Sequence, residues 1–153
     1  MQAVGRLKGA FRRGQRLRRF VTHAGRCYRA RMARSIQIIP SILAADYARL
    51  GEEVAQADRA GADRFHLDMI DGHVFKNLSF GPLMFQALRP YTKKPFDVHV
   101  MATPARDWID ALKVAGCDRI LLHVGLETDL VGLIDLIKAH HMSAGLVLGP
   151  RDS

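Results

Sequence analysis

The chain has 153 residues, of which 48% are hydrophobic and 25% are charged, and its formal net charge is +8. This composition is ordinary for a globular protein of about one domain and excludes a disordered or collagen-like chain. No stretch approaches the roughly 18 consecutive apolar residues of a membrane-spanning helix, so we expect no membrane partner. The two cysteines, Cys27 and Cys117, are too few for a disulfide framework, which favours a reducing, cytoplasmic location.

The positive charge is concentrated at the start of the chain. Residues 1–35 contain 11 Arg and Lys residues and no acidic residue, whereas residues 36–153 contain 12 basic and 15 acidic residues. The body of the chain is therefore mildly acidic, and the basicity belongs to an Arg-rich leader. We accordingly expect no nucleic-acid partner, because the basic residues are not spread over the folded part.

Three interpretations of the leader at 1–35 stay open. The true start could be Met32, four residues before the first strand-like segment, with the upstream residues a mis-called reading frame. An acid-free, Arg-rich segment also fits a transit peptide, which would place the protein in an organelle, although this leader is poor in Ser. The third interpretation is a disordered arm that binds nucleic acid or a membrane surface, since Phe11, Phe20 and Tyr28 are interleaved with the Arg residues.

From residue 36 onward, short apolar segments alternate with amphipathic helical patterns, an order typical of a parallel α/β sheet. We predict strands over residues 36–43, 64–70, 96–101, 119–124 and 144–148. The sequence AGADR at 60–64 recurs as AGCDR at 115–119, and each copy is expected to end a helix and start a strand. This repetition favours a (β/α)8 barrel or a doubly wound sheet. Five strands and four helices are too few to close an eight-stranded barrel, so a barrel here would be truncated.

Four helices are expected between these strands. The first lies between a cap at Asp46 and a stop at Gly61, and the second covers residues 82–88. The third follows a cap at Thr103 and has a proline in its first position. The fourth covers residues 130–137, where apolar residues recur at helical spacing.

Two of the predicted strands carry polar residues at alternate positions. Successive side chains of a strand point to opposite faces. In the sequence FHLDMI at 65–70, the apolar set is expected to face the helices, with His66 and Asp68 pointing to the centre of the sheet or barrel. In FDVHVM at 96–101, Asp97 and His99 are expected to point the same way.

These inward residues predict a divalent-cation site. A buried carboxylate is costly unless it is paired or metal-bound, and imidazole with carboxylate suits Zn, Fe, Mn or Co. Such a site could take a proton next to a carbonyl and stabilise the enediolate. Spacing alone leaves the alternative of hydrogen-bonded core residues open. We interpret His123 as a pocket residue and Asp71 as a brace for the loop that follows it.

Several linked segments resemble the ribulose-phosphate 3-epimerase family. They are PSIL at 40–43, HLDMIDGH at 66–73, NL at 77–78, FGP at 80–82 and DVHVM at 97–101. The resemblance runs in order from about residue 36 to residue 150 and corresponds to the N-terminal part of the family. It implies that residues 36–153 are the N-terminal part of a ribulose-phosphate-binding (β/α)8 barrel, in an α/β protein whose basic extension precedes the barrel.

The resemblance also implies an activity and the residues that carry it. The family consists of isomerases that epimerise D-ribulose 5-phosphate to D-xylulose 5-phosphate at C3 in the pentose phosphate pathway, through a metal-stabilised enediolate. By this resemblance His66, Asp68 and His99 hold a divalent metal (Zn, Fe, Mn or Co), and Asp68 is the proton acceptor. Ser41, His99 and Met101 contact the ketopentose phosphate substrate. A homo-oligomer is expected for a full-length protein.

The sequence also departs from the family pattern. Ile70 stands where the family has Met, Lys76 stands where its loop has Pro, and Gly149 stands where its fifth strand ends in Asn before Pro. The family's second catalytic Asp and its Gly-rich phosphate loops belong to later strands that this sequence lacks. We therefore expect the chain alone to be inactive. A non-catalytic fragment, a pseudoenzyme or an epimerase for another ketose phosphate are the alternatives.

Overall fold

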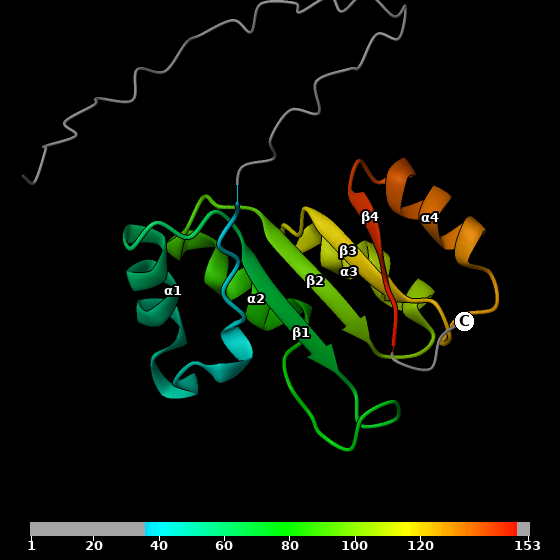
Figure 1. Ribbon diagram of the computed structural model, residues 1–153, viewed down its shortest axis with the longest axis horizontal. Coiled ribbons are helices and arrows are strands. Elements are labelled where there is room, and N and C mark those ends of the chain that lie inside the picture. The colour runs from blue at the N-terminus through cyan, green and yellow to red at the C-terminus, as the bar shows by residue number, and fades with distance from the viewer. Residues whose placement is uncertain (1–35, 150–153) are drawn as a thin grey trace, which may run out of the picture. The chain divides into compact units, whose positions relative to one another are not determined.

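The computed structural model describes residues 36–149, so the predicted leader at 1–35 and residues 150–153 lie outside the described part. Within that part the chain forms one parallel sheet in the order β1, β2, β3, β4 (Figure 1). The strands are Phe65–Ile70, Phe96–Met101, Arg119–His123 and Ser143–Val147. The α-helices are α1 (Leu50–Arg59), α2 (Pro82–Leu88), α3 (Ile109–Val114) and α4 (Leu130–Ala139).

This alternation of parallel strands and helices is that of a (β/α)8 barrel, of which residues 36–149 supply four strands. The predicted strands from residue 64 onward and all four predicted helices are confirmed, with bounds that shift by a few residues. No helix among residues 36–149 has the length and apolar character needed to cross a bilayer.

The predicted first strand at 36–43 is wrong. This segment runs beside β1 but makes a single isolated bridge, between Ser41 and His66, and then turns into a 3-10 helix at Ile42–Ala44. Pro40 has no N–H to donate to a ladder, although its carbonyl accepts from His66 N at 2.9 Å. Ser41 Oγ accepts from Leu43 N at 3.3 Å and so starts the turn.

Two helix starts also differ from the prediction. Asp46 caps a 3-10 turn at Tyr47–Arg49, where its carboxylate accepts from Ala48 N at 3.0 Å, and α1 begins only at Leu50. Thr103 caps no helix, because Pro104 is still extended and a 3-10 turn at Ala105–Trp108 precedes α3. The Ala105 N–H, which a cap would have satisfied, donates instead to Glu127 Oε1 at 2.8 Å.

The core lies between the sheet and the helices behind it in Figure 1. The helix-facing residues of the first three strands are almost completely buried: Phe65, Leu67, Met69, Phe96, Val98, Val100, Ile120 and Leu122. They pack against buried residues of the helices, among them Phe85 of α2 and Leu112 of α3. One face of the sheet is therefore committed to the core, and the alternate side chains are left for the opposite face.

Candidate functional site

The strand register arranges the polar face of the sheet in rows. His66 of β1 lies opposite Asp97 of β2, and Asp68 lies opposite His99. In the next row towards the carboxyl ends, Ile70 lies opposite Met101. Because side chains that face each other across strands share a face, the predicted alternation of both strands is confirmed, and each row has its own chemistry.

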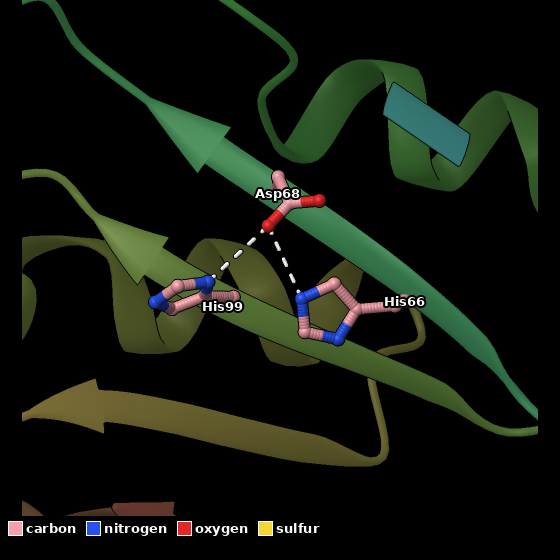
Figure 2. A group of neighbouring side chains, drawn as sticks. All are labelled: His66, Asp68 and His99. Atoms are coloured by element: carbon pink, nitrogen blue, oxygen red, sulfur yellow. Dashed lines mark hydrogen bonds and ion pairs between the residues drawn. The ribbon is translucent and has the colours of Figure 1, made fainter. Parts of the chain in front are cut away.

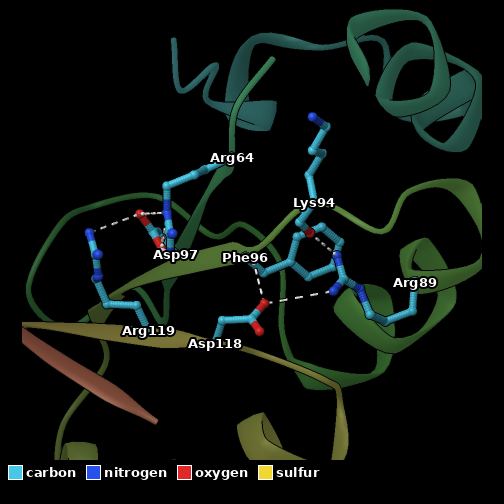
Figure 3. Close-up of polar contacts among 7 residues, drawn as sticks. All are labelled: Arg64, Arg89, Lys94, Phe96, Asp97, Asp118 and Arg119. Atoms are coloured by element: carbon cyan, nitrogen blue, oxygen red, sulfur yellow. Dashed lines mark hydrogen bonds and ion pairs between the residues drawn. The ribbon is translucent and has the colours of Figure 1, made fainter. Parts of the chain in front are cut away.

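Asp97 takes part in a structural ion cluster towards the amino ends of the strands. Arg64 Nε donates to both of its carboxylate oxygens, at 3.0 and 2.8 Å, and Arg119 Nη1 lies 3.4 Å from Oδ2 (Figure 3). The hydrogen bond to Asp97 raises the pKa of the Arg64 guanidinium. Of the four polar residues predicted to share one region, Asp97 is therefore the one that points to other partners.

Of the other three residues, the two histidines converge on one carboxylate oxygen of the aspartate. Asp68 Oδ1 lies 3.1 Å from His66 Nε2 and 3.2 Å from His99 Nδ1, and Figure 2 shows both contacts. Ser41 Oγ donates to the other oxygen, Asp68 Oδ2, at 2.6 Å. The two strands and the segment before them thus hold the carboxylate from three sides.

The electrostatics of this cluster keep the carboxylate ionised. Burial acts to raise the pKa of Asp68, but hydrogen bonds from His66, His99 and Ser41 outweigh it and hold that pKa well below its ordinary value. The hydrogen bond to Asp68 raises the pKa of His66, against the effect of its own burial.

The donor set fits a divalent transition metal. One ligand atom each from His66, Asp68 and His99 lies within 4.8 Å of the others. A metal requires an ionised carboxylate and an imidazole lone pair, and Asp68 already meets the first condition. Two imidazoles with one carboxylate suit Zn, Fe, Mn or Co, so these residues could hold such an ion.

Met101 and His123 lie near the carboxyl ends of the strands. Met101 is 6% exposed and packs in the row above Asp68, beside Ile70. His123 is the last residue of β3, and its Nε2 lies 2.8 Å from His99 Nε2. His123, which the sequence predicts to be a pocket residue, is therefore in direct contact with a candidate metal ligand.

Sequence reasoning missed one residue that supports the site. Ser79, in the loop after β1, donates from Oγ to the Asp68 carbonyl at 2.5 Å and accepts from Ile70 N at 2.9 Å. Its position in a loop, eleven residues after Asp68, gives no local signal of this contact. The loop is also held by Asp71, which accepts from His73 N at 2.9 Å and Thr103 N at 3.1 Å. The predicted bracing role of Asp71 is consistent with these contacts.

Sequence comparison relates the chain to a known family. The model of the ribulose-phosphate 3 epimerase family matches residues 37–152. The chain belongs to this family. It is 44% identical over 117 residues to ribulose-phosphate 3-epimerase 2 of Cupriavidus necator, covering 76% of this chain and 48% of that protein.

Two further ribulose-phosphate 3-epimerases match the chain over a similar length. That of Bacillus subtilis is 42% identical over 116 residues, 76% of this chain and 54% of its own length. That of Escherichia coli is 41% identical over 114 residues, 74% of this chain and 51% of its own length. The chain thus spans about half the length of the curated relatives it matches, and the sequence resemblance over residues 36–150 is confirmed.

Proposed function

We propose that the chain carries the metal-binding and proton-abstracting part of a ribulose-phosphate 3-epimerase. The reaction interconverts D-ribulose 5-phosphate and D-xylulose 5-phosphate by inverting C3 through an enediolate. The observation that carries this proposal is the convergence of His66 and His99 on the ionised carboxylate of Asp68. The names of the relatives supply the substrate, a ketopentose phosphate.

Asp68 is the proton acceptor in this proposal. A carboxylate that takes a proton from carbon must be ionised and fixed in direction. The hydrogen bonds of Asp68 meet both needs: they lower its pKa, and Ser41 holds Oδ2 while Oδ1 faces the imidazoles. A divalent ion held by His66, Asp68 and His99 would polarise the neighbouring carbonyl oxygen and stabilise the negative charge of the enediolate.

The apolar row above Asp68 fits a role in enclosing the sugar. Met101 and Ile70 are both buried and lie at the carboxyl ends of β2 and β1, the end at which barrel enzymes place their active sites. We propose that Met101 packs against the reacting part of the substrate and limits access of water to the enediolate. Ser41 and His99, which already contact Asp68, then lie beside the reacting carbon.

Inversion at C3 needs a base on one face of the carbon and an acid on the other. In the ligand cluster found among residues 36–149, Asp68 supplies the single carboxylate. We therefore propose that these residues perform proton abstraction, whereas the opposite acid comes from a part of the fold outside them. Residues 36–149 alone are expected to give no significant conversion to xylulose 5-phosphate.

Metal content tests this proposal directly. The purified chain is loaded with Zn²⁺ or Mn²⁺, dialysed and analysed, beside the variants His66→Ala and His140→Gln. His140 is a matched control because it pairs with Asp110 at 3.0 Å, away from the cluster. We expect one ion per chain in the wild type and in His140→Gln and a loss in His66→Ala. Equal ion content in all three proteins contradicts the proposed site.

A further inference from the structure

His123 contacts the edge of the His99 ring that points away from Asp68. The His99 ring directs Nδ1 to Asp68 Oδ1 at 3.2 Å and Nε2 to His123 Nε2 at 2.8 Å. Both ring nitrogens of His99 are therefore engaged, each on its own side. His123 comes from β3, two residues beyond Leu121, the register partner of His99.

A hydrogen bond between two ring nitrogens needs one N–H and one lone pair. A metal-ligating nitrogen also needs a lone pair, so a ligating His99 Nδ1 leaves the ring proton on Nε2. That proton can only be donated to a lone pair on His123 Nε2, which in turn places the proton of His123 on its Nδ1. The contact at 2.8 Å thus links the tautomers of the two rings.

We propose that His123 is a positioning residue for the metal site: when a divalent cation takes the place of the proton through which His99 Nδ1 contacts Asp68, His123 accepts the remaining ring proton on His99 Nε2 and so favours the metal-binding tautomer. The inference rests on the proposed function, because it assigns His123 to the same site. Partners of ligating histidines fix ring orientation in this way, and their loss typically weakens metal binding.

The surroundings of His123 hold its ring in place for this role. Its ring centroid lies 4.7 Å from that of His99 and 6.1 Å from that of Phe75 in the loop after β1. Its backbone is in register with Val147 of β4, and the next residue, Val124, donates from N to Val147 O at 3.1 Å. A ring fixed by a strand and by two neighbouring rings can orient His99 without a large loss of side-chain entropy on metal binding.

The alternative is that His123 only fills space, and two variants separate the two roles. His123→Phe keeps an aromatic ring but has no nitrogen to accept the His99 proton. His123→Gln removes the ring but offers an amide oxygen at about the reach of Nε2. His140→Gln is the control for the removal of a histidine elsewhere, and circular dichroism verifies that each variant is folded.

The test is titration with Co²⁺ alone, followed by the visible absorption of the bound ion. We expect His123→Phe to bind Co²⁺ roughly 10- to 100-fold more weakly and to show a changed spectrum. His123→Gln is expected to recover most of the affinity, and His140→Gln to match the wild type. Equal affinity and spectra in the wild type and His123→Phe would overturn the inference while leaving the proposed function intact.

A measurement on the metal-free chain tests the hydrogen bond separately. With ¹⁵N-labelled histidine, nitrogen–nitrogen coupling between His99 and His123 is expected in the wild type and not in His123→Phe. Absence of this coupling in the folded wild type overturns the inference. A folded wild type that shows the coupling but binds no Co²⁺ contradicts the proposed function, and with it the metal role of His123.

Discussion

Asp68 and Asp97 lie on the same face of two adjacent strands, but they have different partners. Asp97 faces Arg64 and Arg119 towards the amino ends of the strands, whereas Asp68 faces two histidines and Ser41. We predict that Asp97→Asn lowers the free energy of unfolding and leaves metal binding unchanged. Asp68→Asn is expected to abolish metal binding.

The magnitude for Asp97→Asn follows from burial. The Asp97 side chain is 4% exposed and that of Arg64 16%, so the substitution leaves a nearly buried guanidinium without its counter-charge. Removing one partner of a buried ion pair costs about 3–5 kcal/mol. The asparagine oxygen can still accept one hydrogen bond from Arg64, so we expect the lower end, about 3 kcal/mol. Arg119 adds little, because it is 37% exposed and its contact is 3.4 Å long.

Urea denaturation followed by circular dichroism measures this loss, and dialysis with Zn²⁺ measures ion content on the same samples. Asp107→Asn is the matched control, since this carboxylate is exposed and surface substitutions change stability by less than about 0.5 kcal/mol. Unfolding of Asp97→Asn at the same urea concentration as the wild type would show that the buried ion pair with Arg64 does not stabilise the fold. Normal folding with loss of the bound ion would place Asp97 in the metal site.

Three further predictions concern the surroundings of the site and the core. Burial raises the pKa of the Cys117 thiol to about 12, so in a Cys27→Ser chain iodoacetamide at about pH 8 should label it only after unfolding; rapid labelling of the native chain contradicts this burial. Gly116→Ala should lower the unfolding free energy by about 1–2 kcal/mol, since φ is +81° and the added Cβ would lie 2.8 Å from Arg89 Cδ; unchanged stability would show that Arg89 moves freely. Ser79→Ala should cost about 1–3 kcal/mol through two lost hydrogen bonds, and an unchanged urea midpoint would show that the loop is not held by this side chain.

The Gly116 prediction involves a packed arginine, which Figure 3 shows over an aromatic ring. The Arg89 guanidinium carbon lies 3.4 Å from the Phe96 ring centroid, and Nη2 donates to the Lys94 carbonyl at 2.6 Å. Arg89 Nη1 also lies 3.7 Å from Asp118 Oδ2. These contacts resist displacement of the arginine stem, which is why a methyl group at residue 116 is expected to be costly.

The sequence was sufficient to predict which face of each strand carries the site. Alternation with period two separates Phe65 and Leu67 from His66 and Asp68, and the structure buries the first pair against the helices. Alternation does not tell which residues of neighbouring strands lie opposite each other, because that depends on the register between the strands. The sequence pattern therefore groups Asp97 with Asp68, although Asp97 lies one row away beside two arginines.

Other features depend on contacts that local sequence does not contain. The pairing of His123 with His99 follows from the packing of β3 against β2, and that of Ser79 with Asp68 from the path of a loop. The segment at 36–43 has the apolar residues of a strand, but Pro40 limits its hydrogen bonding and Ser41 starts a turn. Propensity favoured a strand there, and tertiary contacts decided otherwise.

We propose that Asp68, within the His66–Asp68–His99 cluster, takes the proton from C3 of ribulose 5-phosphate. Exchange of that hydrogen in D₂O, followed by NMR on the metal-loaded chain, measures this step. A base on one face alone returns deuterium to the face from which it took the proton. We therefore expect exchange at C3 by the wild type without net formation of xylulose 5-phosphate, and loss of exchange in Asp68→Asn. Exchange by Asp68→Asn as fast as by the wild type would contradict the proposal.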